Sequence, residues 1–162
     1  MTELINKILV YIDGTEESIA AAQYAVCMAK KTGADLSALY VINTRALNDL
    51  VRSHIFFKEE QEEYSRDLEE DAERYLNHVR DLARRKGLAI NTEKRSGSVS
   101  SEIKKMVKEN EIDLLIIGEI SRLQSRRDEF YNEVERAMRS VDCSVLISKN
   151  TERTWEIYEA LE

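Results

Sequence analysis

Short apolar runs alternate along this chain with longer segments of helical periodicity, and this alternation limits the folds open to it. Four runs predict strands, and the first three have the nearly continuous apolar character of strands buried on both faces of a sheet. The four predicted strands are Lys7–Ile12, Leu36–Ile42, Asp113–Gly118 and Cys143–Ser148. A fifth run, Leu88–Lys94, alternates apolar and polar residues and predicts a half-exposed strand near a sheet edge.

The segments between the strands carry apolar residues at spacings of three and four, which indicates amphipathic helices. In the first of them, Thr15 fits an N-cap and Gly33 fits a C-terminal end. The acidic pair Glu16 and Glu17 suits the positive end of the helix dipole. A long helix with an acidic run, which we expect to be a solvated face, is predicted to end near Gly87.

Two more helices are predicted, one starting near Ser98 or Ser100 and one over residues 130–141. Residues 43–57 show no clear period, and we expect a loop or a short helix there. The tail, residues 150–162, has apolar residues spaced by three and is compatible with a short docked helix.

Strands that alternate with helices predict a parallel sheet joined by right-handed crossovers, with helices on both faces. A length of 162 residues fits one such doubly wound domain, and the absence of proline argues against a Pro-rich linker between modules. Ligands of these domains lie outside the carboxyl ends of the strands, where the strand order reverses. Gly14, Gly97 and Gly118 fall at such ends, so we seek function in those loops.

The composition argues against several classes of function. With 24 Lys+Arg and 31 Asp+Glu the net charge is −7, which weighs against nucleic-acid binding because that binding needs a basic face. No apolar run approaches the roughly 20 residues that span a bilayer, and no secretory signal is visible, so no membrane partner is expected. Cys27 and Cys143 lie far apart in the sequence, which favours reduced thiols in a cytoplasmic protein.

Three segments of the chain, in the same order, resemble the universal stress protein family. Lys7–Ser18 resembles its opening strand and Asp-Gly-Ser/Thr turn, Glu111–Gly118 its fourth strand, and Val134–Ile147 its last helix and strand. The resemblance implies a single doubly wound α/β domain of the adenine nucleotide alpha hydrolase type, with a five-stranded parallel sheet in the order 3-2-1-4-5. That domain would span residues 1–149, and residues 150–162 would form a C-terminal tail.

Members of that family that bind ATP carry a loop of Gly, two residues, Gly, nine residues, Gly and then Ser or Thr. Placed here without gaps, the loop starts at Gly118, but Ser121 and Tyr131 replace the other two glycines. Glycine matters there because it lets backbone N–H groups approach a phosphate closely. Asn132 takes the Ser/Thr position, and Glu133 adds a carboxylate that would repel phosphate at the helix N-terminus. We therefore expect weak ATP binding or none, and no other cofactor or metal.

Other residues favour a nucleotide. The resemblance implies that Asp13 contacts the nucleoside and that Val41 lies beside the adenine, although Asp13 also suits a turn that caps a helix. Three loop arginines could hold an anion or pair with nearby carboxylates in a solvated loop, namely Arg122, Arg126 and Arg127. Ser121 and Asn132 keep some hydrogen-bonding capacity, so weak binding stays open. The candidate nucleotide cleft therefore consists of Asp13, Val41, Gly118, Ser121 and Asn132.

Nothing in the sequence supports catalysis. It holds no nucleophile elbow, no Walker phosphate loop and no dinucleotide fingerprint. His54 and His78 lie in the variable, largely helical segment between about Arg45 and Lys86, away from the strand ends. Cys143 matches a cysteine common in the family, and a reactive thiol there would need a depressed pKa.

Two functions remain once nucleic-acid binding, membrane partners and catalysis are disfavoured. The first is a noncatalytic stress-response module that acts as a homodimer or through a regulatory protein. Its physical basis is the apolar last strand, Val145–Ile147, which lies at a sheet edge in the implied order and needs a partner. Trp155 and Tyr158 could cover that edge or join the interface. The second function is an adenine-nucleotide switch that uses the cleft between the first and fourth strands.

Overall fold

The computed structural model of the chain describes residues 3–44, 58–120 and 129–162, without the side chains of residues 58 and 129–132. One sheet runs through it, and all of its strands are parallel, in the order β3-β2-β1-β4-β5. This confirms the predicted fold class and strand order. The strands are β1 (Lys7–Ile12), β2 (Asp35–Ile42), β3 (Asn91–Ser96), β4 (Leu114–Gly118) and β5 (Ser144–Ser148).

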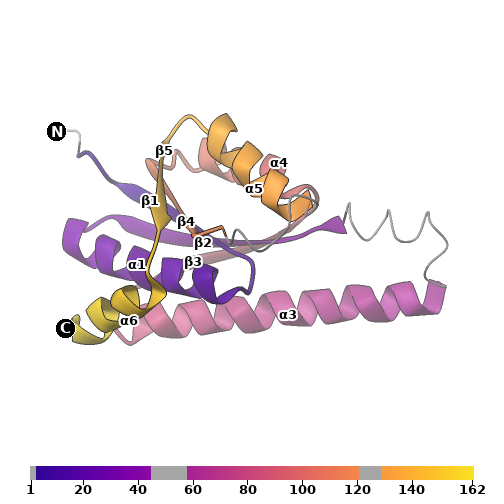
Figure 1. Cartoon of the computed structure of the whole chain (residues 1–162), viewed down its shortest axis with the longest axis horizontal. Helices are drawn as coiled ribbons and strands as arrows, with labels where there is room; N and C mark the ends of the chain where they lie inside the picture. The colour runs from indigo at the N-terminus through magenta and orange to yellow at the C-terminus, as the bar shows by residue number, and fades with distance from the viewer. Residues whose placement is uncertain (1–2, 45–57, 121–128) are drawn as a thin grey trace.

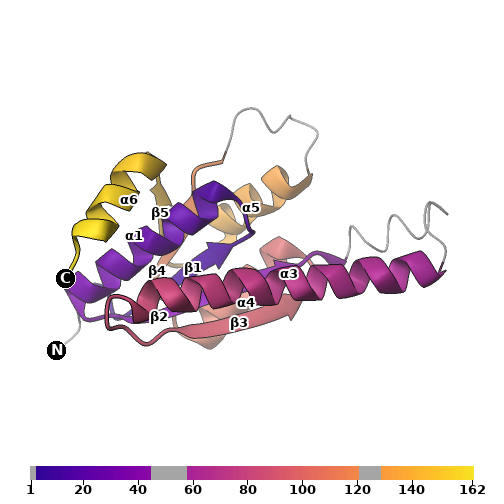
Figure 2. The same cartoon turned by 90° about the horizontal axis from the view of Figure 1, so that it is seen from below.

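Helices cover both faces of the sheet (Figures 1 and 2). One face carries α1 (Glu16–Thr32), α3 (Lys58–Arg84) and α6 (Thr151–Ala160). The other face carries α4 (Val99–Glu109) and α5 (Glu129–Ser140). The helices lie on two sides because each parallel crossover returns the chain to the same end of the sheet over one face or the other.

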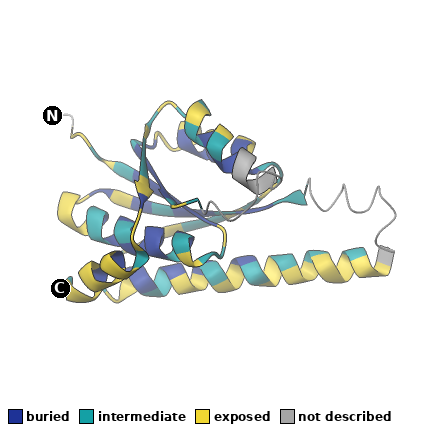
Figure 3. Cartoon of the chain, in the orientation of Figure 1, coloured by how far each residue is buried: buried dark blue, intermediate teal, exposed yellow. Residues whose placement is uncertain are grey.

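The central strand β1 separates two apolar cores. Alternate side chains point to opposite faces, so Ile8, Val10 and Ile12 pack under α1 and α3, whereas Leu9 and Tyr11 pack under α4 and α5. All five of these residues are buried. Figure 3 shows the buried band running through the sheet and the inner faces of the helices.

The ends of α1 are those that the sequence predicts. Thr15 is the N-cap, and its Oγ1 accepts a hydrogen bond of 3.1 Å from the N–H of Ser18. Gly33 follows the last turn in a left-handed conformation, with φ of 75°.

The third strand is where the prediction is wrong. The sequence pattern placed it at residues 88–94, but β3 is Asn91–Ser96. Leu88 lies just past the end of α3, where its N–H donates to the carbonyl of Ala83 at 3.0 Å. Leu88 and Ile90 both pack against the core under α1 and α3, so their apolar character reflects helix packing. β3 does lie at a sheet edge, as expected.

The helix α3 extends well past the sheet (Figures 1 and 2). Its 27 residues make a rod of about 40 Å at 1.5 Å per residue. Its buried residues all lie in the half nearer its C-terminus, from Ala72 to Ala83. The acidic half is largely exposed (Figure 3), which agrees with a solvated face. The segment 43–57, where we expect a loop or a short helix, lies outside the described residues from position 45 on.

The C-terminal helix α6 packs against α1 and is bonded to the C-terminal end of α3. Tyr158 is buried, and its hydroxyl donates to the carbonyl of Leu82 at 2.7 Å. Lys86 Nζ lies 4.8 Å from the centre of the Tyr158 ring and donates to the carbonyl of Leu161 at 2.7 Å. A cation therefore meets the negative end of the α6 dipole, which favours this docked position.

At the middle of the molecule, the end of β4 touches the first turn of α1. A Cβ added to Gly118 would lie 2.4 Å from the carbonyl oxygen of Glu17 and 2.9 Å from the nitrogen of Ser18. Both atoms belong to backbone, so neither can swing aside. The glycine is therefore required for close packing of α1 on the sheet.

We predict that Gly118→Asn lowers the free energy of unfolding by about 3 kcal/mol, because the new side chain must force α1 away from β4. Gly33→Asn is the matched control: asparagine tolerates a left-handed backbone, and a Cβ at Gly33 meets no atom within 4 Å. Its loss should stay below about 1 kcal/mol. Urea unfolding of both variants measures the difference, and equal losses would contradict the steric explanation.

Candidate functional site

The carboxyl ends of β1 and β4 lie side by side at the centre of the sheet. From there the chain order runs outward in both directions, through β2 and β3 on one side and through β5 on the other. This is the switch point at which doubly wound folds bind ligands. Asp13 follows β1 directly, and Gly118 is the last residue of β4, so two predicted cleft residues flank this point.

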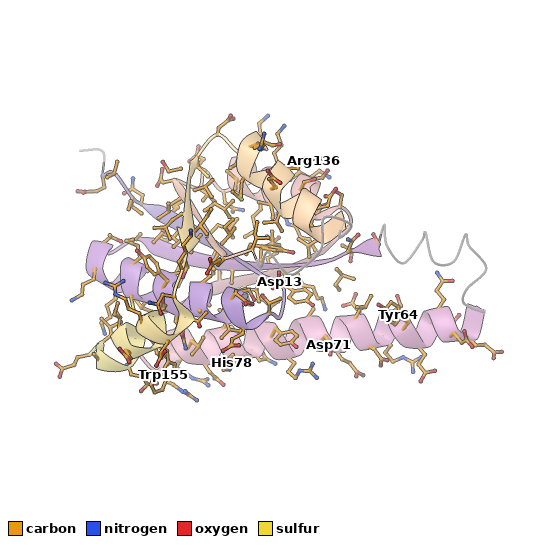
Figure 4. The ribbon with its side chains drawn as sticks, viewed as in Figure 1. Asp13, Tyr64, Asp71, His78, Arg136 and Trp155 are labelled. Carbon is orange, nitrogen blue, oxygen red and sulfur yellow. The ribbon has the colours of Figure 1, made fainter. Side chains whose placement is uncertain are left out.

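Asp13 closes the turn between β1 and α1 (Figure 4). Its Oδ1 accepts hydrogen bonds from the N–H of Thr15 at 3.0 Å and from Thr15 Oγ1 at 2.6 Å. Its own N–H donates to Ser18 Oγ at 3.3 Å. The side chain is nevertheless exposed at the rim of the sheet. Asp13 therefore has the geometry of a turn residue and keeps an anionic group facing solvent.

Of the three remaining predicted cleft residues, the structure describes the side chain of Val41 but not those of Ser121 and Asn132. Val41 is buried near the end of β2 and packs in the core under α4 and α5. Ser121 lies outside the described residues, as do the three loop arginines. Tyr131 and Asn132 lie in the first turn of α5, but their side chains are outside the described part of the chain.

Glu133 does not take the place that the sequence predicted for it. We expected its carboxylate at the N-terminus of its own helix, but it is turned to the N-terminus of α4. Its Oε2 accepts hydrogen bonds from Ser98 Oγ at 2.8 Å, from the N–H of Ser100 at 3.0 Å and from Ser100 Oγ at 2.7 Å. Only 7% of the residue is exposed. Arg136 Nη1 donates to its other oxygen at 3.3 Å.

This arrangement makes Glu133 the cap of a neighbouring helix. Ser98 occupies the N-cap position of α4 but makes no side-chain capping bond to its own helix. The carboxylate supplies the missing acceptor and places a negative charge at the positive end of the α4 dipole. It therefore binds α5 to α4 through a charged hydrogen-bond network.

Two groups on the α4 and α5 side of the sheet, Glu133 and Tyr11, have shifted pKa values. Burial alone would raise the pKa of Glu133, but the hydrogen bonds from Ser100 and Ser98 outweigh burial and lower that pKa. Burial raises the pKa of the Tyr11 hydroxyl well above its ordinary value, and the negative charges of Asp13 and Glu133 raise it further. Both carboxylates thus act on one buried hydroxyl at the end of β1. Sequence reasoning missed Tyr11, which looks like an ordinary strand residue.

The described residues include no candidate metal cluster and no candidate membrane-spanning helix. No group of three or more His, Cys, Asp or Glu side chains in that part of the chain could hold a metal ion. None of its helices is both long and apolar enough to cross a membrane.

We predict that Glu133→Gln lowers the free energy of unfolding at neutral pH by about 1–2 kcal/mol, since it removes the charge at the α4 N-terminus. A carboxyl with a lowered pKa binds its proton more readily in the unfolded chain. Its stabilising effect is therefore present above the unfolded pKa and is lost as the pH falls through the folded pKa. The wild type and the variant should converge in acid, as measured by urea unfolding across a pH series.

Glu135→Gln is the control on the same helix. Glu135 pairs with Arg139 at 2.9 Å in an exposed position, where an ion pair contributes little. If the free energy of unfolding of Glu133→Gln differs from that of the wild type by the same amount at all pH values, the capping role of Glu133 is contradicted.

Known proteins share both the sequence pattern and the fold. The model of the universal stress protein family matches residues 5–149. A universal stress protein of Methanocaldococcus jannaschii, MJ0531, is 27% identical over 150 residues, which cover 93% of this chain and 85% of that protein.

Solved structures of the family have the same fold. A family member from Burkholderia pseudomallei superposes with a TM-score of 0.70 at 19% identity, over 93% of this chain and all of that chain. A family protein from Arabidopsis thaliana with AMP bound superposes with a TM-score of 0.65 at 12% identity, over 91% of this chain and 94% of that chain. The family match, which covers most of the chain, identifies this protein as a member of the universal stress protein family.

Proposed function

We propose that this chain is a noncatalytic stress-response module that works as a homodimer and binds adenine nucleotides weakly or not at all. The observation that carries the nucleotide part is the position of the Glu133 carboxylate, which accepts hydrogen bonds from Ser98 and Ser100 at the N-terminus of α4. A phosphate placed at that helix end would meet a carboxylate, and like charges repel. The proposal is specific to this member, because the Arabidopsis relative was solved with AMP.

The loss of backbone positions that could hold phosphate supports the same proposal. Of the three glycines expected in a phosphate loop, only Gly118 is present, and Ser121 and Tyr131 stand at the other two positions. Gly118 itself packs against the α1 backbone. The N-terminus of α4, which could otherwise attract an anion, already has the carboxylate of Glu133 bound to it. The fold thus uses an internal anion where a ligand could supply one.

The alternative is an adenine-nucleotide switch. Asp13 favours it, because its carboxylate is exposed at the switch point where the family resemblance places the nucleoside contact. Weak nucleotide contact at the rim would require no change in the packing of α1 or α4.

Titration calorimetry with Mg-ATP and with AMP distinguishes the two functions. We expect no saturable heat and no thermal shift at millimolar ligand, and no ATP turnover. Asp13→Ala serves as the matched variant. If the wild type binds and Asp13→Ala does not, the switch function holds and our proposal for the crevice is wrong.

The proposed dimer rests on the difference between the two sheet edges. The sequence of β3 is NTEKRS, and its two cations pair with the helices: Lys94 with Glu69 of α3 at 2.7 Å and Arg95 with Glu109 of α4 at 2.7 Å. Charged side chains protect an edge from pairing. The sequence of β5 is SVLIS, and Ile147 is 39% exposed. The apolar edge is the one that favours a partner strand.

The backbone of β5 has hydrogen-bonding groups directed outward. Ser144 donates its N–H to the carbonyl of Asp113 on the inner side, at 3.3 Å. Alternate residues of a parallel strand bond to opposite sides, so the amides of Val145 and Ile147 point away from β4. A second copy of β5, related by a two-fold axis, would satisfy them.

We predict that Ile147→Pro abolishes the dimer, because it removes an outward N–H while the bonds between β5 and β4 remain. Ile147→Val keeps the amide and the strand preference, so that variant should dimerise like the wild type. Sedimentation equilibrium at micromolar concentration measures both. A wild-type chain that sediments as a monomer would remove the dimer from the proposal.

A further inference from the structure

A groove of about 320 Å³ lies between α1 and α6, which pack side by side (Figures 1 and 2). One wall is a stripe of α1 at helical spacing, made of Glu16, Ile19, Ala20 and Gln23. The other wall is the N-terminal part of α6, with Thr151, Glu152 and Trp155. The volume is at the lower end of the range of about 300–1,000 Å³ in which small-molecule sites fall. The groove therefore has the size for a small ligand.

The side-chain amide of Gln23 is the unusual group in this groove. Gln23 follows three alanines on the buried face of α1, and only 8% of the residue is exposed. Its amide makes no hydrogen bond to any residue that the structure describes. In the same part of the chain, no side-chain nitrogen or oxygen is both wholly buried and without a partner. The Gln23 amide therefore reaches the open space of the groove, where a ligand can bond to it.

The amide at this position does nothing for the packing of α1. Burial of a polar group without a hydrogen bond costs free energy, whereas an apolar side chain of the same shape avoids that cost. Water satisfies such a group in part, and so does a ligand with a matching donor or acceptor. The charges around the groove indicate which ligand is favoured.

The groove has a net negative charge. Glu16 and Glu152 line it, and its described lining residues include no Lys, Arg or His. Neither carboxylate forms an ion pair with a residue that the structure describes. Each lies in the first turn of its helix, where the dipole contributes about half a positive charge. Two full negative charges against two half charges leave a net charge of about −1, so the groove attracts a cation.

Trp155 makes this cation an organic one (Figure 4). The residue borders the groove and is 53% exposed, and a tryptophan ring attracts ammonium groups more strongly than other aromatic rings do. An ammonium N–H can donate to Gln23 Oε1, and an alkyl chain can contact Ile19 and Ala20. A metal ion fits poorly, since no group of three metal-ligating side chains occurs in the described ranges. The lining thus matches an alkylammonium ion.

We propose that the groove between α1 and α6 binds a small alkylammonium ion. Its ammonium group is held by the carboxylates of Glu16 and Glu152 and donates to Gln23 Oε1, while Trp155 contacts the cation through its ring. The ligand is a primary or secondary amine, because a quaternary ammonium ion has no N–H for Gln23. The site requires neither a nucleotide nor a second copy of the chain, so it goes beyond the function proposed above.

Trp155 is the only tryptophan in the chain, so its emission reports on the groove without a label. The probe is n-butylammonium chloride, titrated into the wild type at constant ionic strength. We expect a change in Trp155 emission that saturates at millimolar ligand. Tetramethylammonium, which lacks an N–H, and butan-1-ol, which lacks a charge, should each bind about tenfold more weakly.

Gln23→Leu tests the amide, because it keeps the approximate size of the side chain and removes the hydrogen-bond acceptor. It should raise the Kd for butylammonium about tenfold. Its urea midpoint should equal or exceed that of the wild type, since the amide has no partner among the described residues. Gln61→Leu is the matched control: Gln61 lies on α3 outside the groove, and its loss should leave the Kd unchanged.

A second pair of variants tests the charge. Glu152→Gln should raise the Kd about two- to fivefold, as expected for an exposed ion pair. Glu156→Gln is its control, because Glu156 lies on the same helix but does not line the groove. That substitution should leave the Kd unchanged.

Three binding results would overturn the site. One is a titration in which neither emission nor calorimetry gives a saturable signal. Another is an equal Kd for Gln23→Leu and the wild type. The third is butan-1-ol that binds as tightly as butylammonium, because the groove would then recognise apolar surface alone.

Two further results are also decisive. If Gln23→Leu unfolds far more readily than the wild type, the amide is structural; the site then depends on the second pair, and equal Kd values for Glu152→Gln and Glu156→Gln overturn it. A capped Gly-Lys-Gly peptide that binds more tightly than butylammonium assigns the groove to a lysine of a partner and overturns the free ligand. None of these results changes the proposals for the nucleotide or the dimer.

Discussion

The burial of β1 on both faces is the constraint from which the other features follow. Ile8 and Val10 lie in one core and Leu9 and Tyr11 in the other, so helices must cover both sides of the sheet. A parallel sheet meets this requirement because its crossover helices supply the cover. The same arrangement brings the carboxyl ends of β1 and β4 together. The switch point between β1 and β4 thus follows from the burial of the central strand on both faces.

Glu133 caps the N-terminus of a helix other than its own. Helix N-termini attract anions because their N–H groups lack partners within the helix. Here the α4 N-terminus receives a carboxylate from α5, which is both a structural cross-link and an internal substitute for a bound anion. The family fold is preserved, while the N-terminus of α4 is satisfied by the protein itself. A nucleotide would have to compete with that network or avoid it.

The two edge strands of the sheet differ in their side-chain chemistry. The polar strand β3 carries Lys94 and Arg95, whose charges are paired with flanking helices and oppose pairing with another sheet. The apolar strand β5 has α6 beside it, and α6 exposes Trp155 while its own position is fixed by buried Tyr158. Assembly through this edge would need no rearrangement of the core.

Local patterns were enough to predict most of the elements, since apolar runs and helix ends depend on neighbours a few residues away. Thr15 and Gly33 end α1 as their sequence context indicates. The predicted bounds of the third strand were wrong because Leu88 packs against the core at the end of α3. Sequence alternation cannot show which element a side chain packs against. Asp13 could be placed at the crevice because it ends a strand whose position in the sheet the family resemblance implied. Sequence by itself therefore determined the element types and their order along the chain. Only the tertiary structure decided where the Glu133 carboxylate goes, because its partner Ser100 lies 33 residues away and no local period carries information over that separation.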